Sequence, residues 1–559
     1  MTGPHAIVVV MLAILSAILV ADNGIAHAKL VLSADTGRPT TSTFSFGEKV
    51  EVTFTIAGLA ENGQTTLVLD VRNEFGKSIA KPEPVVLSGN MGGKAQYAFS
   101  APSTMLGYYE ISAKLVDGTP LSALGTRPAG IVSYAVVPDP QTRIDYGDSF
   151  SRFGLQGGFS TSALVLPYLG ARYILSGNNW ERMEPDHPGQ FKEERSKADQ
   201  AGKRHPAKAA ENERPIFNGR EWATYHISTV TTASLPSWAL KPNTSGTICK
   251  KFGELNEEGV KALPGFALAH AKAFAADYST QKNRFYQVTW EPAAGWCYGG
   301  TPEGLVKIYE QCYRALHQGD PQAIVAGPTL FLEKNSSAQL VDLWKAGLGR
   351  SIDALSIHPY ISGWPPETHG MPTILREQLA AAQKAKGQPI RFLGTEQGYT
   401  AADHGNLKKA MGDIRLTLMM LGEGANLDFG FYVADFLEDP KEKTNKGYGY
   451  YWNLNTSINF GTDKLGPKII VPAYAAMTYF LDGTTSRGTL SDIEGSQLGY
   501  TFKKPHATIV AVWDYNGTSS YKVPAGAKVC DWMGNCSEAK QPKITIGGAP
   551  TYFIQGDVP

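Results

Sequence analysis

Two glutamates in this 559-residue chain follow short apolar runs at which a strand would end. Glu291 closes the segment 285–291 (FYQVTWE) and is followed by Pro292, while Glu396 closes the segment 390–396 (IRFLGTE). A pair of carboxyl groups in one cleft suits the cleavage of an acetal. One group must be protonated to give its proton to the leaving oxygen, while the other must be ionised to attack or stabilise the cationic carbon. The two glutamates are therefore candidate catalytic residues.

The pattern around these glutamates predicts a barrel that would bring them together. Between residues 145 and 485, eight short apolar runs alternate with helix-like segments, which is typical of βα units and a parallel sheet. We expect strands at residues 154–159, 173–176, 227–231, 285–289, 324–327, 354–357, 390–395 and 429–434. The number and length of these units predict an α/β fold with a (β/α)8 barrel. Glu291 and Glu396 then end the fourth and seventh strands and face one another across the barrel mouth.

Helix signals between the runs support the same interpretation. Thr301 and Pro302 have the residue types of an N-cap and a first helical position, and that helix would stop near Gly319. Pro372 similarly opens a segment that would stop near Gly387. Residues 191–215 differ, with 12 charged residues in 25 positions, and we interpret them as a solvated surface insertion, with a lid as the alternative.

Strand-like segments without helices flank the predicted barrel. Residues 29–140 alternate apolar and polar positions in short runs broken by Gly, Asn, Asp and Pro, which predicts an immunoglobulin-like β-sandwich. After residue 486 the alternation returns and predicts a small C-terminal β domain. The expected organisation is a β-sandwich over 29–140, a catalytic barrel over 141–485 and a β domain over 486–559.

The N-terminus has the features of a secretion signal. Residues 6–21 are hydrophobic throughout but are short for a membrane span of about 20 residues. Ala26-His27-Ala28 follows as a small-x-small cleavage site. We interpret residues 1–28 as a signal peptide of a secreted or periplasmic protein, with an uncleaved N-terminal anchor as the alternative.

Five cysteines leave one without a partner. Cys530 and Cys536 flank a short turn-like segment and are expected to form a disulfide in an oxidising compartment. Cys249 and Cys297 are candidates for a second disulfide. Cys312 has the spacing of a buried helix position and is expected to be a free thiol. The cysteines and histidines do not have zinc-ligand spacing, and we expect neither a metal nor an organic cofactor.

The balance of charges gives no indication of a nucleic-acid partner. Lys and Arg number 52, and Asp and Glu also number 52, so the chain carries no basic excess. A neutral partner, or one recognised by local charge in a cleft, fits better. We also expect no integral membrane partner and a monomeric chain.

Several motifs occur in order along residues 150–559. They lie at residues 169–175, 180–185, 235–238, 291–292, 355–360, 394–396 and 529–535. The ordered set resembles the retaining glycoside hydrolases of clan A, most closely family 39 and its bacterial relatives that degrade exopolysaccharides. The resemblance implies that Glu291 is the general acid/base, that Glu396 is the nucleophile, and that the partner is a poly- or oligosaccharide.

Aromatic residues and one histidine near these motifs are candidates for substrate binding, because aromatic rings stack on sugar rings. The candidates are Trp180, Trp238, Trp290, Trp296, His358, Tyr360, Tyr399 and Tyr432. Glu181 and Glu184 are instead expected to be structural. Trp290 departs from the family pattern, which places Asn before the acid/base to contact the sugar 2-hydroxyl.

Two other functions remain open from the sequence. A non-catalytic polysaccharide-binding protein on a barrel scaffold is suggested by Trp290. A structural component of an exopolysaccharide export assembly is suggested by the additional N-terminal β domain.

Overall fold

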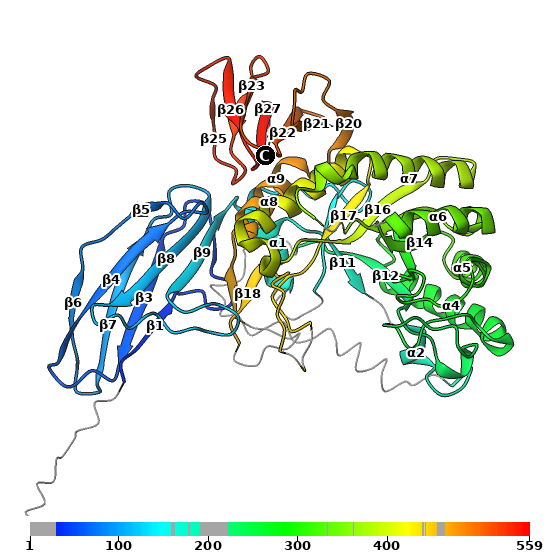
Figure 1. Ribbon diagram of the computed structural model, residues 1–559, viewed down its shortest axis with the longest axis horizontal. Coiled ribbons are helices and arrows are strands. Elements are labelled where there is room, and N and C mark those ends of the chain that lie inside the picture. Colours follow the sequence, from blue (N-terminus) through cyan, green and yellow to red (C-terminus); the bar gives the residue numbers. More distant parts are fainter. Residues whose placement is uncertain are drawn as a thin grey trace, which may run out of the picture.

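The computed structural model describes residues 29–157, 162–176, 179–190, 222–332, 334–360, 363–438, 441, 443–455 and 464–558. Its centre is a closed barrel of parallel strands, as predicted (Figure 1). The barrel strands are β10 (Phe153–Leu155), β11 (Tyr173–Ser176), β12 (Tyr225–Thr232), β13 (Arg284–Thr289), β14 (Ala323–Phe331), β15 (Ala354–His358), β16 (Arg391–Gln397) and β17 (Leu427–Gly430). The predicted signal peptide and the charged insertion at 191–215 lie outside the described residues.

The eighth strand ends earlier than the sequence predicts. The expected end was Ala434, but β17 stops at Gly430. After Phe431, whose N–H still donates to Gln397 O, the backbone of Val433 donates to Gln156 O. The chain therefore leaves the ladder with β16 and turns toward the first barrel strand, and the predicted boundary is wrong.

Helices surround the barrel and carry the expected end signals. The helices are α1 (Ser162–Leu169), α2 (Trp180–Met183), α4 (Glu257–Asp277), α5 (Pro302–Gly319), α6 (Lys334–Ala346), α7 (Met371–Lys386), α8 (Ala401–Gly422) and α9 (Ile470–Leu481). The Thr301 hydroxyl accepts from Gly304 N at the start of α5, and Gly387 has φ 79° after α7. Both ends agree with the sequence pattern, because a hydroxyl satisfies a free N–H and glycine adopts positive φ without steric cost.

The N-terminal segment forms two sheets that lie beside the barrel (Figure 1). One has the order β1-β3-β7, and the other has the order β2-β9-β8-β4-β5 with β6 on β4. The strands are β1 (Val31–Asp35), β2 (Thr43–Ser45), β3 (Val50–Ala57), β4 (Gln64–Arg72), β5 (Ser78–Ala80), β6 (Val85–Ser88), β7 (Lys94–Ala101), β8 (Gly107–Leu115) and β9 (Ile131–Val137). Alternate residues of β3 are buried, so the sheets enclose a core of their own.

The C-terminal sheets pack on the barrel helices. The larger has the order β20-β21-β22-β27-β24-β25, and β23 pairs with β26. The strands are β20 (Thr485–Thr489), β21 (Gln497–Lys504), β22 (Ala507–Asp514), β23 (Ser519–Lys522), β24 (Lys528–Cys530), β25 (Cys536–Glu538), β26 (Lys543–Ile546) and β27 (Thr551–Gly556). Tyr500 and Trp513 belong to the same buried cluster as Leu418 of α8, so this sheet shares the core of the barrel. The domain boundaries at 140 and 485 stay predictions.

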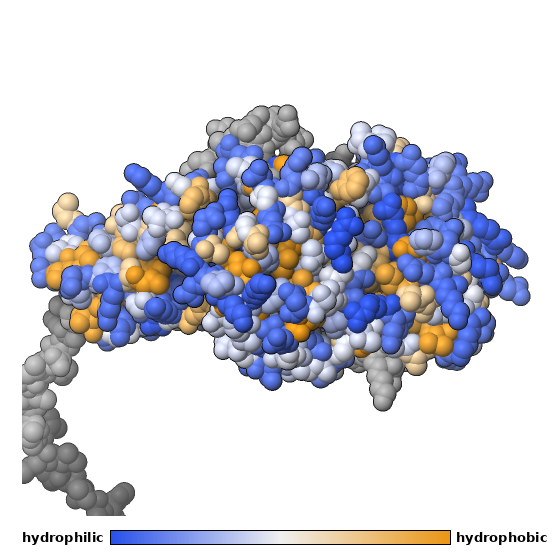
Figure 2. Space-filling model, turned by 90° about the horizontal axis from the view of Figure 1, so that it is seen from above, coloured by the Kyte–Doolittle hydropathy of each residue, from blue (hydrophilic) through white to orange (hydrophobic). Residues whose placement is uncertain are grey.

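Two disulfides and one free thiol account for the cysteines. Cys530 pairs with Cys536, as predicted, and Cys249 pairs with Cys297. Cys312 is buried in α5 and free. None of the helices within the described ranges has the length and apolar character of a membrane span. On the face shown in Figure 2, hydrophobic residues form small patches among hydrophilic ones.

A buried ion pair fixes the start of β13, the strand that leads to Glu291. Asp320, at the end of α5, accepts Nε and Nη2 of Arg284 at 2.6 Å each and Tyr286 Oη at 2.9 Å. Its side chain is fully buried. Because removal of one partner leaves a buried charge unpaired, such pairs are costly to break.

We therefore expect Asp320→Ala to lower the free energy of unfolding by about 3–5 kcal/mol in urea denaturation. Asp342→Ala is the matched control, because the Asp342–Lys345 pair is exposed and should contribute about 0–1 kcal/mol. Equal losses in the two variants would contradict a stabilising role of the buried pair.

Candidate active site

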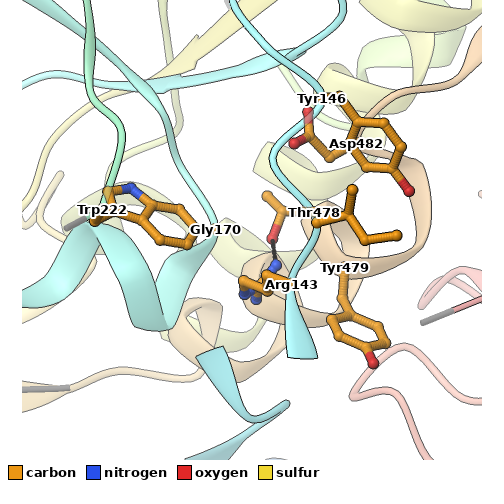
Figure 3. Close-up of a pocket in the computed structure, with 8 residues that line it drawn as sticks. Arg143, Tyr146, Gly170, Trp222, Thr478, Tyr479 and Asp482 are labelled. Atoms are coloured by element: carbon orange, nitrogen blue, oxygen red, sulfur yellow. Dashed lines mark hydrogen bonds between the residues drawn. The ribbon is translucent and has the colours of Figure 1, made fainter. Parts of the chain in front are cut away.

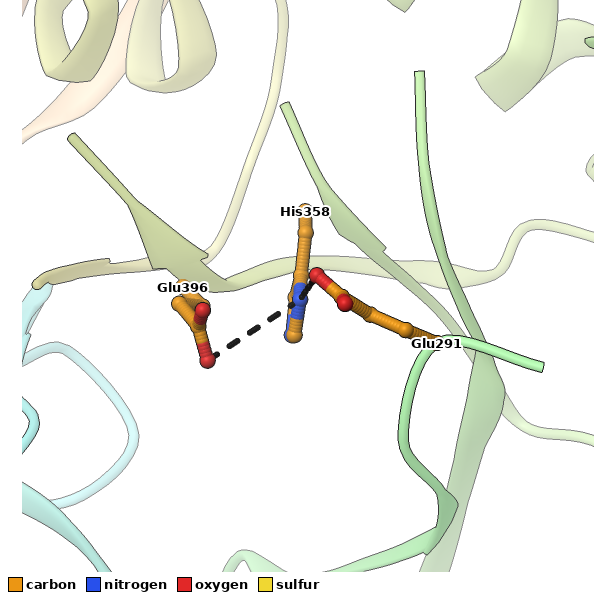
Figure 4. A group of neighbouring side chains, drawn as sticks. All are labelled: Glu291, His358 and Glu396. Carbon is orange, nitrogen blue, oxygen red and sulfur yellow. Dashed lines mark hydrogen bonds and ion pairs between the residues drawn. The ribbon is translucent and has the colours of Figure 1, made fainter. Parts of the chain in front are cut away.

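The two predicted glutamates lie together at the carboxyl ends of their strands (Figure 4). Glu396 belongs to β16, and Glu291 follows β13 by two residues. Glu291 has φ 42°, a conformation that is uncommon for a residue with a side chain, and its N–H donates to Thr329 O at 3.0 Å. One carboxylate oxygen of each glutamate and a ring nitrogen of His358 all lie within 4.8 Å of one another.

His358, at the end of β15, stands between the two carboxyl groups (Figure 4). Its Nδ1 lies 2.9 Å from Glu291 Oε1 and 4.0 Å from Glu396 Oε2. Burial disfavours the charged ring, but the charge of Glu396 and the hydrogen bond and charge of Glu291 outweigh burial, so the pKa of His358 is raised. The imidazole is fully buried, so it separates and orients the glutamates from beneath the cleft.

Three side chains donate hydrogen bonds to Glu396. Tyr360 Oη donates to Oε1 at 2.9 Å, while Trp290 Nε1 and Gln156 Nε2 donate to Oε2 at 3.2 and 2.9 Å. Hydrogen bonds of this kind favour the ionised carboxylate. The indole of Trp290 therefore contacts the carboxylate itself at the position where the resembling family has Asn.

The ionisation of Glu396 is a balance of opposing effects. Burial raises the pKa of Glu396, and the negative charge of Glu291 raises it further. The charge of His358 and the hydrogen bonds from Tyr360 and Trp290 lower it again, without fully offsetting burial. The net pKa stays above the ordinary glutamate value, as expected for two carboxyl groups that share a buried site.

An open cleft of about 910 Å³ lies above the glutamates. Its walls are largely aromatic and carry a few charged side chains. The lining residues are Trp290, Glu291, Trp296, Phe331, Tyr360, Gly363, Glu396, Gly398, Tyr399, Thr400, Asp403, His404, Phe431, Phe436, Glu438, Lys446 and Tyr448. Four of the predicted substrate-binding residues, Trp290, Trp296, Tyr360 and Tyr399, thus lie at the cleft.

Trp180 and Trp238, which the sequence predicts to bind substrate, do not line the cleft in this structure. The Trp180 side chain is fully buried, packs on Trp238 and Phe266, and donates from Nε1 to Glu184 Oε2 at 2.6 Å. Trp238 Nε1 donates to Glu184 O at 2.9 Å. Both indoles and Glu184 therefore contact one another, Trp180 packs on α4, and the structural role expected for Glu184 is confirmed.

Tyr432 is set back from the cleft. It does not line the cleft itself, but its ring lies 5.0 Å from that of Phe436, which does. His358 is likewise beneath the surface and reaches the cleft only through the glutamates.

The sequence interpretation missed several residues of the site. Gln156 lies within the run that was predicted as the first strand, and that position gave no sign of its hydrogen bond to Glu396. Phe431, Phe436 and Tyr448 follow β17, where the chain folds back over the barrel mouth. The aromatic residues that follow the last barrel strand were the one sequence feature that could have indicated this wall of the cleft.

The group of Glu291, His358 and Glu396 also has residue types that can bind a cation. In this structure the ring nitrogen that faces the carboxylates is hydrogen-bonded to Glu291, and both oxygens of Glu396 accept from protein donors. These contacts fit a hydrogen-bonded carboxyl pair better than a set of metal ligands.

A second hollow lies near the amino ends of the strands (Figure 3) and is far smaller. Its volume is about 10 Å³, enough for roughly one water molecule. Arg143 lines it, and its Nη1 donates to Thr478 Oγ1 at 3.1 Å. The large cleft at the opposite end is therefore the candidate site.

A disulfide secures one wall of that cleft. Cys249 and Cys297 join the loop after β12 to the loop after β13. Beside the disulfide, Ile248 N donates to Trp296 O at 2.9 Å. The exposed indole of Trp296 is thus held at the cleft rim by a covalent link and a backbone hydrogen bond.

Comparison with known proteins identifies the fold. No protein-family model matches the chain, and no curated protein matches its sequence. A family 39 glycoside hydrolase from the gut symbiont Bacteroides cellulosilyticus WH2 superposes with a TM-score of 0.62 at 17% identity, covering 94% of this chain and 100% of that one. The chain therefore has the fold of a family 39 glycoside hydrolase, which confirms the resemblance seen in the sequence at the level of the fold.

Other similar structures give lower scores. The catalytic domain of family 30 xylanase C from Talaromyces cellulolyticus has a TM-score of 0.48 at 12% identity, covering 73% of this chain and 96% of that one. A family 39 β-xylosidase from Caulobacter crescentus has a TM-score of 0.45 at 12% identity, covering 74% and 98%.

Substitution of a buried tryptophan and of a tryptophan at the cleft should differ in their effect on the free energy of unfolding. We expect Trp180→Ala to lower the free energy of unfolding by about 3–5 kcal/mol, because it removes a buried aromatic side chain. Trp296→Ala should change it by no more than about 0.5 kcal/mol, because Trp296 is 41% exposed. Urea denaturation followed by circular dichroism measures both, and a neutral Trp180→Ala would contradict its structural role.

Proposed function

We propose that the protein is a retaining glycoside hydrolase that cleaves a poly- or oligosaccharide by double displacement. The carrying observation is the separation of the two glutamates, whose nearest oxygens lie within 4.8 Å beneath an aromatic cleft. Retaining enzymes hold their carboxyl groups about 5–5.5 Å apart, whereas inverting enzymes need about 6.5–9.5 Å to admit a water. The short separation supports retention.

The hydrogen bonds support different roles for the two carboxyl groups. Three donors point at Glu396, which suits an ionised nucleophile. Glu291 instead contacts His358 Nδ1, which can share a proton with it. Glu291 is therefore the proposed acid/base, in agreement with the order of the two residues in the resembling family.

The reaction then proceeds in two balanced steps. In the first, a Glu396 oxygen bonds to the anomeric carbon, the glycosidic bond breaks, and Glu291 gives its proton to the leaving oxygen. In the second, Glu291 takes a proton from water, the water oxygen bonds to the anomeric carbon, and the bond to Glu396 breaks. Both steps use only the two carboxyl groups and water.

The cleft supports a carbohydrate as the substrate. Trp296, Phe331, Tyr399 and Tyr448 present aromatic surface that can stack on sugar rings. The volume of the cleft, about 910 Å³, is at the upper end of the range of ligand pockets and suits a substrate of more than one sugar. We also propose that the signal peptide directs secretion, which would place the enzyme where extracellular polysaccharide occurs.

Glycan-panel digestion tests the proposal, with product analysis by mass and by proton NMR of the new anomeric centre. We expect the first-formed product to keep the anomeric configuration of the substrate. Glu396→Gln should lower turnover at least 1,000-fold (~4 kcal/mol of barrier) while the protein stays folded, because the nucleophile is lost. Inverted products would exclude double displacement, and binding of a glycan without cleavage would favour a glycan-binding protein instead.

The pKa of Glu396 predicts the acid side of the pH profile. Attack requires the ionised carboxylate, so kcat/KM falls as pH falls through the pKa of Glu396 in the free enzyme. Because burial and Glu291 raise this pKa, the fall should be centred above the ordinary glutamate value of about 4.3. Full activity persisting well below pH 4 would contradict this environment.

A further inference from the structure

Gln156 approaches Glu396 from β10, whereas Tyr360 approaches from β15 on the other side of β16. The backbone of Gln156 is held in place by hydrogen bonds. It follows directly after β10, which ends at Leu155. Its N–H donates to Gly430 O at 3.0 Å, and its carbonyl accepts Val433 N at 2.9 Å. These hydrogen bonds connect the backbone of Gln156 to the end of β17 and to the segment that follows. The side chain of Gln156 therefore extends from a backbone whose position is fixed.

The orientation of the Gln156 amide follows from its two contacts. Nε2 lies 2.8 Å from Thr395 O and 2.9 Å from Glu396 Oε2. A backbone carbonyl oxygen can only accept, so the NH₂ group must face Thr395 O. One hydrogen of that group is then engaged by the backbone of β16, and the other is directed at the neighbouring carboxylate.

Trp290 places a second donor on the same oxygen. Its Nε1, 3.2 Å from Glu396 Oε2, carries a hydrogen and has no acceptor capacity. A proton on Oε2 would therefore meet two donors and no acceptor. The two side chains together stabilise the carboxylate and oppose its protonation at Oε2, while Tyr360 occupies Oε1.

We propose that Gln156 is a positioning residue that, together with Trp290, keeps Glu396 ionised and fixes the plane of its carboxylate for attack. The inference rests on the proposed function, because attack by Glu396 is part of that function. Gln156 acts through Glu396, so its loss should change the ionisation of that group as well as the rate.

Other titratable groups face Glu396 from the remaining sides. Glu291 approaches from the loop after β13, His358 and Tyr360 approach from β15 and the residues after it, and Tyr448 approaches from the segment after β17. Burial and the charge of Glu396 raise the pKa of Tyr448 to about 12, so it stays neutral and contributes no charge. Gln156 supplies the contact from β10, and as a neutral amide it acts without adding a charge.

The direct test measures the ionisation of Glu396 without substrate. Infrared difference titration, with the Glu396→Gln variant to assign the carboxyl band, gives its pKa in the wild type and in Gln156→Met. Methionine has similar length and no N–H, so we expect the pKa to rise by about one unit or more, a tenfold loss of ionisation. Gln64→Met, which changes an exposed glutamine on β4, should leave it unchanged.

A second variant allows the test to be made if Gln156→Met does not fold. Gln156→Glu keeps the size of the side chain but adds a like charge beside Glu396, so the pKa should rise further. An unchanged pKa of Glu396 in a folded Gln156→Met or Gln156→Glu protein would overturn the proposal.

Kinetics separate this proposal from the proposed function. On a glycan that the wild type cleaves, Gln156→Met should lower kcat at least tenfold with little change in KM and should move the acid side of the kcat/KM profile to higher pH. An unmoved profile would overturn the positioning role. If the wild type cleaves no glycan, the proposed function fails, whereas the infrared titration still decides whether Gln156 controls Glu396.

Discussion

Two carboxyl groups are buried next to one another at the mouth of this barrel. The residues around them lower the energetic cost of placing two acidic groups side by side. Two like charges within 4.8 Å in a water-poor site repel strongly, so both cannot ionise freely. His358 stands between them, and Gln156, Trp290 and Tyr360 all donate to one of the two. The two carboxyl groups therefore have different surroundings: three side-chain donors contact Glu396, whereas Glu291 contacts His358.

The surrounding fold holds these donors at fixed distances. Gln156, Glu291, His358 and Glu396 come from the ends of β10, β13, β15 and β16, so their relative positions are set by the ladders of one closed sheet. Behind that sheet, the C-terminal strands share a core with α8, and Trp513 Nε1 donates to Glu367, which also pairs with Arg415 of α8. The C-terminal sheet therefore stabilises the barrel on the side that carries Glu396.

The sequence allowed the barrel, the strand order and the two glutamates to be predicted because each rests on a local pattern. An apolar run that ends in a polar residue indicates a strand end, and eight such runs indicate the closed sheet. The position of an aromatic ring depends instead on distant segments. Trp180 and Trp296 both follow closely after barrel strands, yet Trp180 is buried against Phe266 of α4 and Trp296 is exposed at the cleft rim. The contact between Gln156 and Glu396 spans 240 positions and gives no local signal.

In the proposed reaction, Glu396 forms a covalent bond to the anomeric carbon of the sugar. The most direct measurement is intact-protein and peptide mass spectrometry of Glu291→Gln after incubation with an aryl glycoside of a sugar that the enzyme cleaves. An activated leaving group needs no acid, while loss of the base slows release of the intermediate. We expect a mass increase of one glycosyl residue on the peptide that contains Glu396. Rapid release of the aryl group with no adduct and with inversion of the anomeric centre would contradict it.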